Sequence, residues 1–306
     1  MTSHAEVRPC EGVSSSRDRY IGLVQLAVGA TLISFSGGFV TLAEVGPTMA
    51  GVYRNFIGGA ILLAIVLVRR KRLWWGFGAF RACVLCALLF GLELSFYHRS
   101  IRYVGMGLAC LLGNFQFLFL AGFGIAVLGE KPSWKLFVSF FLSLLGLFMI
   151  VGIDWGDLEK IYKIGVVLGL ITAFLYSAYL LVLRRIQSGT NFEQAMANMV
   201  VISLVSAFAM WLEGLSQHEI FWAADSKSWW ALIAYGLVSQ ASGWLLISKG
   251  LPKLEASRAG LVLLLQPTLA FFWDVLFFAR PIDVVEIIGL VLALGGIYLG
   301  TIRQRP

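Results

Sequence analysis

Charged residues are scarce in this chain of 306 residues. They make up 13% of it, against about 25% in a typical soluble domain. Hydrophobic residues make up 59%, and the mean hydropathy is +0.83. Apolar runs long enough to cross a hydrocarbon core of ~30 Å recur along the whole sequence. The composition therefore excludes an ordinary soluble domain and predicts an all-α polytopic membrane protein.

Motifs for nucleotide-driven or catalytic chemistry are also missing. The sequence contains no G-x-x-x-x-G-K-[ST], no D-F-G and no H-E-x-x-H. Cys83 and Cys86 form a C-x-x-C inside an apolar run, without the second cysteine pair or nearby histidine that a metal site needs. We therefore expect no enzyme activity, no cofactor and no metal. An intramembrane enzyme and a scaffold or receptor stay as alternatives, and substrate-dependent flux in liposomes separates a carrier from both.

The net charge of +7 reflects basic residues in short loops between apolar runs, so we expect a lipid bilayer as the partner and no nucleic acid. The first 19 residues are polar and lack the apolar core of a cleavable signal peptide. Lys and Arg concentrate in alternate loops, as in the run 69–72 and at Arg184 and Arg185. The positive-inside rule then places both termini in the cytoplasm, with the chain in a bacterial inner membrane.

An internal duplication organises the chain. Ala109, Leu111 and Gln116 recur 150 residues later as Ala259, Leu261 and Gln266. After a gap of one residue, Pro132, Leu145 and Gly146 match Pro281, Leu294 and Gly295. We expect an N-terminal tail at 1–19, a first five-helix repeat at 20–152, an outer linker at 153–163 and a second repeat at 164–302.

Ten spans are expected from the apolar runs. They cover approximately residues 20–41, 47–68, 76–98, 104–128, 132–152, 164–186, 192–213, 229–249, 255–278 and 282–302. Because five is an odd number, the second repeat must enter the membrane inverted. Inverted repeats are typical of transporters, whose substrate site lies near the midplane between the repeats.

The chain resembles the drug/metabolite transporter superfamily, in its ten-helix EamA-repeat form. The resemblance rests on GPTMAGVYRNFIGGAILL around Arg54, FYHRSIRYVGMGLA, LGEKP at 128–132 and SKGLPKLEASRAGLVLLLQP at 248–267. Spans 1–3 look most like those of aromatic amino acid exporters. The resemblance implies two inverted repeats around a central cavity built mainly by the first four helices of each repeat. One departure is Arg280, which stands where the first repeat has Glu130.

Polar and aromatic side chains inside the expected spans are the candidate substrate contacts, since each polar group is costly in lipid. The amides Gln116 and Gln266 lie at matching depth in the two repeats, where they would suit a zwitterion, and interhelical hydrogen bonding is their alternative role. Trp244 lies far from both membrane boundaries and is either a cavity wall or a packing residue. Asn114 is a candidate with the same alternative role as the glutamines. Tyr176 and Tyr179 share a helix face and are either a packed aromatic pair or part of the site. Ser239 and Gln240, near the middle of span 8, complete the candidates.

Charged and titratable side chains inside spans are candidates for structural or coupling roles. Arg54 and Glu93 lie in the outer third of neighbouring spans, where we expect them to form a structural ion pair; the alternative is that Arg54 extends outward to the membrane surface. His98 ends span 3 and could titrate near neutral pH, although an interfacial histidine is more often solvated. No carboxylate is expected at the midplane, which favours transport down the substrate's own gradient.

These features together predict a membrane carrier that exports a small organic metabolite by alternating access. Amino acids, aromatic ones included, are the leading substrates on the strength of the resemblance. The alternative is export of other amphiphilic metabolites or cationic drugs. The sequence leaves the coupling ion and the oligomeric state open, and a monomer is compatible with it.

Overall fold

The computed structural model describes residues 16–73, 76–104, 109, 112–127, 129, 134–151, 159–278 and 284–301. These residues form helices and their connections, without a strand. The helices of the first repeat are α1 (Ser16–Ser34), α2 (Ser36–Leu42), α3 (Pro47–Val68), α4 (Phe77–Val104), α6 (Gln116–Ala126) and α7 (Trp134–Val151). The all-α architecture expected from the sequence is thereby confirmed.

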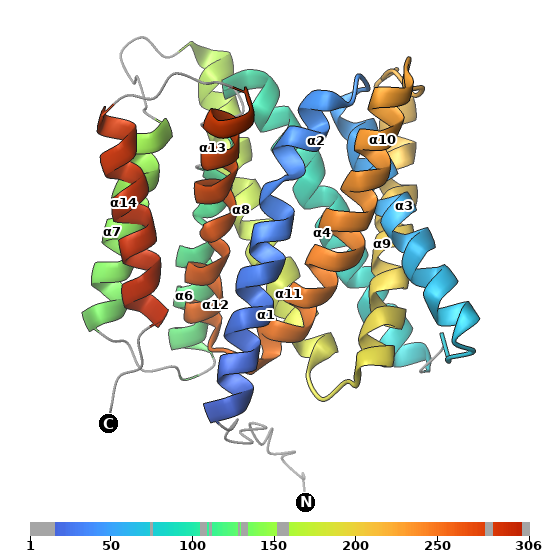
Figure 1. Ribbon diagram of the computed structural model, residues 1–306, viewed down its shortest axis with the longest axis horizontal. Coiled ribbons are helices and arrows are strands. Elements are labelled where there is room, and N and C mark those ends of the chain that lie inside the picture. Colours follow the sequence, from blue (N-terminus) through green and yellow to red (C-terminus); the bar gives the residue numbers. More distant parts are fainter. Residues whose placement is uncertain are drawn as a thin grey trace, which may run out of the picture.

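The second repeat begins with two long helices, α8 (Lys160–Gln187) and α9 (Phe192–Ser216). The eighth span is composite: α10 (Ser226–Ala234) leads into a π-helix, η1 (Tyr235–Trp244), and then into α11 (Leu245–Gly250) and the 3₁₀ turn η2 (Leu251–Lys253). The last helices are α12 (Ala256–Leu263), α13 (Leu265–Phe278) and α14 (Val284–Thr301). The start and end of the described chain, at α1 and α14, lie at one end of the molecule, called the terminal end below (Figure 1).

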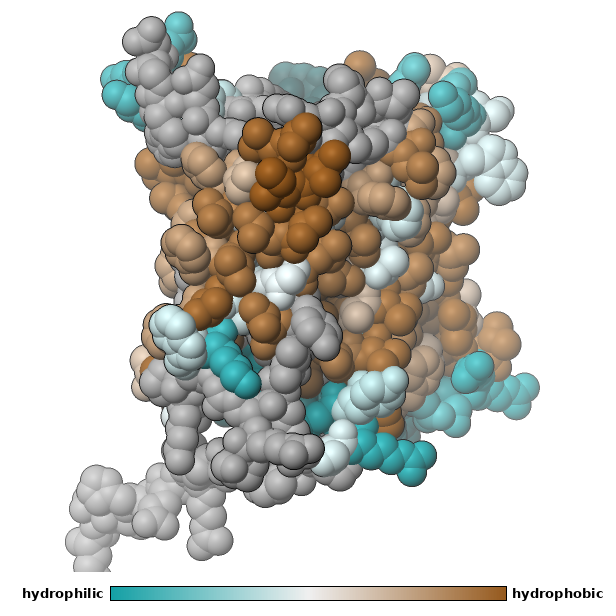
Figure 2. All heavy atoms as spheres, turned by 60° about the vertical axis from the view of Figure 1, so that its left-hand side comes forward, coloured by the Kyte–Doolittle hydropathy of each residue, from teal (hydrophilic) through white to brown (hydrophobic). Residues whose placement is uncertain are grey.

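The apolar character of much of the surface fits a protein whose helices cross a membrane. Six of the described segments are long and apolar enough to cross a membrane, and three shorter apolar helices lie at 134–146, 258–270 and 287–296. Figure 2 shows a broad hydrophobic belt around the middle of the molecule, with hydrophilic residues gathered towards its two ends. The chain is therefore a multi-pass membrane protein, with its apolar side chains facing lipid rather than an aqueous solvent.

Breaks occur at equivalent places in the two repeats. A turn at Phe115 directly precedes α6 and Gln116, and a turn at Leu264 separates α12 from α13 just before Gln266. The first span also bends, at Phe35, where the Phe35 ring stacks on Trp273 with centroids 4.6 Å apart. The Trp273 indole N–H donates to Ser34 Oγ at 2.7 Å and so fixes this bend to α13.

Contacts between the two repeats dominate the packing. The most extensive helix pairs are α7 with α14, α4 with α8, α3 with α9, α4 with α9, α3 with η1, α1 with η1 and α11, and α6 with α12. The third span of the first repeat (α4) thus packs on the first span of the second repeat (α8). Reciprocally, the third span of the second repeat (η1 and α11) packs on the first span of the first repeat (α1). A two-fold relation between the repeats produces this reciprocal pattern, and α7 and α14 stand side by side at one edge of the molecule (Figure 1).

The orientation can be tested with two exposed serines at opposite ends of the molecule. Ser188 follows α8 at the terminal end, and Ser226 begins α10 at the opposite end. In a background without native cysteines, we expect Ser226→Cys to react with a membrane-impermeant maleimide on intact cells. Ser188→Cys should react only after permeabilisation, because the positive-inside rule predicts that its end faces the cytoplasm. Labelling of Ser188→Cys in intact cells would contradict the orientation.

Candidate functional site

A cluster of buried aromatic rings lies where the two repeats meet. Trp244, at the end of η1, is 2% exposed. Its ring makes edge contacts with Phe90 of α4 at 5.3 Å and with Tyr179 of α8 at 5.1 Å between centroids. Tyr176 contacts both Trp244, at 6.1 Å, and Tyr179, at 6.2 Å, while Phe90 stacks on Tyr179 at 4.6 Å. We call these four residues the aromatic cluster.

Two polar atoms of the aromatic cluster are buried without a hydrogen-bond partner. They are Trp244 Nε1 and the Tyr179 hydroxyl, and neither has a partner among the described residues. Gln266 lies at the Tyr176 hydroxyl, which links α13 to the cluster. A buried donor without a partner costs about 1–3 kcal/mol, so such a group needs a reason to persist. Such groups are candidates for contact with a ligand.

Arg54 of α3 is held beside the cluster by the π-helix. Its Nε donates to Gln240 Oε1 at 3.1 Å, and its Nη1 donates to the Tyr235 hydroxyl at 3.3 Å. Tyr235 and Gln240 are five residues apart, which is the spacing that π-helical hydrogen bonds bring together. Gln240 also donates to Ser203 Oγ of α9 at 2.9 Å. The guanidinium is therefore fixed by neutral groups, and its carbon lies 5.7 Å from the Phe90 centroid and 5.2 Å from that of Tyr235.

Glu93 belongs to the same buried region, although the ion pair expected with Arg54 is not formed. Both side chains are 6% exposed, and they interact electrostatically. No nitrogen–oxygen contact within 4.0 Å joins them in the described part of the chain. The expectation of a direct pair was wrong, because Arg54 turns towards the π-helix, where its Nε and Nη1 bond to Gln240 and Tyr235. Glu93 lies one helical turn after Phe90 on α4, which places it beside the aromatic cluster.

The other predicted residues divide between this region and its surroundings. Ser239 of η1 accepts a hydrogen bond from Ser36 Oγ at 3.0 Å and so ties the π-helix to α2. Gln116 is 2% exposed and its Oε1 has no partner among the described residues. Asn114 is also buried. Among the described residues, no contact joins Gln116 to the aromatic cluster. His98 lies at Gly51 of α3, away from the rings around Trp244.

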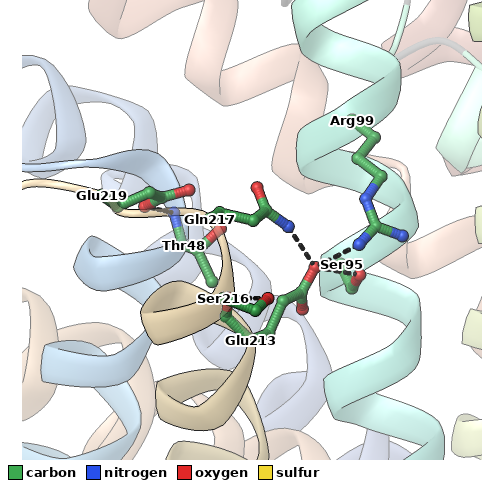
Figure 3. A network of polar contacts seen from close by, with 7 residues as sticks. All are labelled: Thr48, Ser95, Arg99, Glu213, Ser216, Gln217 and Glu219. Carbon is green, nitrogen blue, oxygen red and sulfur yellow. Dashed lines mark hydrogen bonds and ion pairs between the residues drawn. The ribbon is translucent and has the colours of Figure 1, made fainter.

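A polar network joins the repeats at the end opposite the termini (Figure 3). Glu213 Oε1 accepts hydrogen bonds from Ser95 Oγ at 2.6 Å, Arg99 Nη2 at 2.8 Å and Gln217 Nε2 at 2.9 Å. Glu219 Oε2 accepts from the backbone N–H groups of Thr48 and Met49, at 3.0 and 3.2 Å. A carboxylate at a helix N-terminus is favourable, so Glu219 caps α3 from the other repeat.

A nearby aspartate shows the same capping chemistry within one helix. The backbone N–H of Ser228 donates to Asp225 Oδ1 at 2.8 Å and caps α10. Hydrogen bonds from the side chain and the backbone of Ser228 hold the pKa of Asp225 below its ordinary value. The carboxylate form of Asp225 is therefore the form that fits this turn.

Contacts at the terminal end also cross between the repeats, but they use lysines. Lys253 Nζ donates to Gln25 Oε1 at 2.8 Å, which ties η2 to α1. Lys71 and Glu193 form an ion pair at 2.7 Å with side chains 40% and 37% exposed. Exposed ion pairs of this kind are worth at most about 1 kcal/mol. Glu213, which accepts three hydrogen bonds, is therefore held more firmly than Glu193, which makes one exposed ion pair.

Comparison with known proteins identifies the family. The sequence model of the EamA-like transporter family matches residues 20–152 and again residues 163–302. The chain belongs to the EamA-like transporter family. It is a membrane transporter with two EamA repeats, whose ends correspond closely to the two sets of helices described above.

Two bacterial relatives and one solved structure extend the comparison. The chain is 23% identical over 292 residues to the uncharacterized transporter YoaV of Bacillus subtilis (strain 168), covering 91% of this chain and 97% of that one. It is 22% identical over 263 residues to the uncharacterized transporter YwfM of the same organism, covering 85% and 86%. A crystal structure with 18% sequence identity superimposes with a TM-score of 0.77 over 94% of this chain and 98% of that chain. That structure supports the fold alone.

Sequence reasoning missed three residues of this region, Phe90, Tyr235 and Ser203. Phe90 lies three residues before Glu93 on α4, a spacing that places both on one helix face. Tyr235 precedes Gln240 by five residues. If the span were a regular α-helix, these two residues would lie on different faces. Only the π-helical register explains why both reach Arg54.

Proposed function

We propose that this EamA-like transporter exports amino acids, aromatic ones included, across the bacterial inner membrane by alternating access. The observation that carries the proposal is the aromatic cluster with its unpartnered polar atoms between the repeats. Trp244 and Tyr179 are in edge contact within this cluster, and the Trp244 N–H and the Tyr179 hydroxyl lack partners among the described residues. Inverted-repeat carriers bind their substrates between the repeats.

Cationic drugs are the second candidate, because Glu93 is a buried carboxylate and aromatic rings attract cations. Counterflow into proteoliposomes containing only the purified protein distinguishes the two. Vesicles loaded with unlabelled phenylalanine should accumulate labelled phenylalanine, and a twenty-amino-acid panel should rank the aromatic members first. If amphiphilic cations exchange and no amino acid does, the second candidate replaces the first.

Trp244 should contribute to the preference for aromatic substrates. Stacking on one ring is worth about 0.5–1.5 kcal/mol beyond burial of area. Trp244→Ala is therefore expected to lower the ratio of phenylalanine to threonine transport by about a factor of 2 to 12. The ratio cancels differences in the amount of folded protein in the membrane.

Trp230→Ala is the matched control, because Trp230 of α10 is 70% exposed and lies outside the aromatic cluster. It should leave the ratio of phenylalanine to threonine transport unchanged. The two amides, Gln116 and Gln266, are expected to affect both substrates alike when each is replaced by alanine, since both substrates present the same backbone groups. An unchanged ratio in Trp244→Ala, with full activity in both glutamine variants, would show that the substrate binds elsewhere.

A further inference from the structure

We infer that Arg54 and Glu93 form a charge clamp for a zwitterion, in which the guanidinium binds the substrate carboxylate and Glu93 binds the substrate ammonium group. This inference rests on the proposed function and assigns the two charges of the amino acid to two residues. The inference rests on two observations: Arg54 and Glu93 are both buried, and each has hydrogen-bonding groups without a described partner.

Glu93 has the character of an acceptor kept open for a ligand. Its side chain is 6% exposed, and it makes no hydrogen bond or ion pair with any described residue. Leaving a carboxylate buried and unpaired is expensive, and a charged residue inside a membrane span marks a functional site by default. A primary ammonium group supplies three donors, so it can satisfy this carboxylate fully.

Arg54 is oriented but not neutralised. Two of its nitrogens are used, Nε by Gln240 and Nη1 by Tyr235, and both partners are neutral. The second terminal nitrogen, Nη2, makes no hydrogen bond to a described residue. Arginine presents donors in a planar fork that matches the two oxygens of a carboxylate. Holding one side of the guanidinium on the π-helix leaves its other donors for such a ligand.

Arg54 and Glu93 bear opposite charges beside the aromatic cluster, so that their net charge is zero. Arg54 and Glu93 both interact electrostatically with Tyr176 and with Tyr179. Their opposite charges attract each other, but they do not come into contact. A zwitterion carries the complementary pair of charges and brings no net charge into the membrane interior. An amine or an acid with one charge satisfies one residue and leaves the other unpaired, which is the costly outcome in a desolvated site.

The region around the clamp fits the rest of an aromatic amino acid. Phe90 lies one helical turn before Glu93, and its ring contacts both Trp244 and Tyr179. Arg54 lies over the same ring, with its guanidinium carbon 5.7 Å from the centroid. The two charges and the apolar rings therefore meet around Phe90, so one small molecule can contact all of them.

The test compares three probes that share a phenyl ring and differ in charge: phenylalanine, phenethylamine and phenylpropionate. Binding is measured by calorimetry on the purified full-length protein in detergent, and uptake is measured in proteoliposomes. The wild-type protein should prefer phenylalanine over both other probes by about tenfold or more, the value of one charge-assisted hydrogen bond. Equal binding of either singly charged probe would overturn the clamp.

The variants should show a crossed pattern. Glu93→Gln should remove the preference for phenylalanine over phenylpropionate and keep the preference over phenethylamine. Arg54→Gln should do the reverse. A residue with a merely structural role would weaken all three probes by the same factor. Glu213→Gln, a carboxylate outside the clamp, is the control whose selectivity should match the wild type.

Two further results keep the inference decidable. If Arg54→Gln does not fold, Arg54→Lys keeps a cation and should retain the preference over phenethylamine, while Glu93→Asp should retain the preference over phenylpropionate. If phenylalanine is bound and transported but neither Glu93→Gln nor Arg54→Gln changes selectivity, the clamp is wrong and the proposed function stands. If the wild type takes phenethylamine and not phenylalanine, the amino acid function itself is wrong.

Discussion

Replacing Gly58 with leucine is expected to abolish transport and to destabilise the protein strongly. Gly58 of α3 faces η1 so closely that an added Cβ would lie 2.5 Å from Gln240 Cβ and 2.8 Å from the carbonyl oxygen of Gly236. Gly236 faces back, since a Cβ there would lie 3.0 Å from the backbone nitrogen of Gly58. Small residues allow this approach of two helix backbones in a membrane. A larger side chain must separate α3 from η1 and displace Gln240, the partner of Arg54.

Gly122→Leu is the matched control for this substitution. Gly122 lies in α6, and a Cβ added there would meet no atom within 4 Å. Overpacking costs typically about 1–3 kcal/mol and occasionally more, and the contact at Gly58 involves backbone atoms that cannot turn away. We expect thermal unfolding in detergent to shift far more for Gly58→Leu than for Gly122→Leu, with counterflow lost only in the former. Equal behaviour of the two variants would contradict the close crossing.

Removing the Glu213 carboxylate is expected to produce the second large effect, a loss of about 1.5–3 kcal/mol of stability. One oxygen of Glu213 accepts three hydrogen bonds, from Ser95, Arg99 and Gln217. Glu213→Ala leaves the Arg99 guanidinium and the Ser95 hydroxyl without this acceptor. The Glu213 side chain is only 17% exposed, so water replaces the lost bonds poorly.

Glu193→Ala provides the comparison on the same helix. Glu193 pairs with Lys71 at the other end of α9, and both side chains are more than a third exposed. The loss there should be at most about 1 kcal/mol. Unfolding temperatures of the two variants, measured side by side in one detergent, decide the point. A larger loss for Glu193→Ala than for Glu213→Ala would show that burial does not govern these contacts.

Sequence patterns predicted the architecture well because hydrophobic length and the duplication are properties of the chain itself. The apolar runs specify where helices cross the membrane, and the repeat specifies that the third span of one repeat is equivalent to that of the other. The π-helix was beyond such reasoning, since its hydrogen-bond register leaves no signature in composition. Gln240 was a candidate on depth alone, and its bond to Arg54 depends on that register.

Depth along a helix was predictable, whereas the direction in which a side chain points was not. Arg54 and Glu93 were correctly grouped as two charges on neighbouring spans, but the first turns to the π-helix instead of the second. The equivalent glutamines illustrate the same limit. Gln266 lies at Tyr176, whereas no described contact joins Gln116 to the aromatic cluster. A repeat fixes equivalent positions in the backbone, and the sequence around each one has since diverged.

The interleaved pairing of the two repeats also constrains how the protein is made. The first repeat leaves the ribosome before the second, yet its helices α1, α3 and α4 find their main partners in η1, α11, α8 and α9. Until those helices are inserted, Arg54 has neither Gln240 nor Tyr235 to bond with and faces lipid or other unpaired helices. The nascent first half is therefore an assembly intermediate whose inter-repeat surfaces are uncovered. A chain truncated after the first repeat would expose Arg54, which is buried in the full-length protein, to the membrane. Synthesis of the second half is what turns five separately inserted helices into a folded domain.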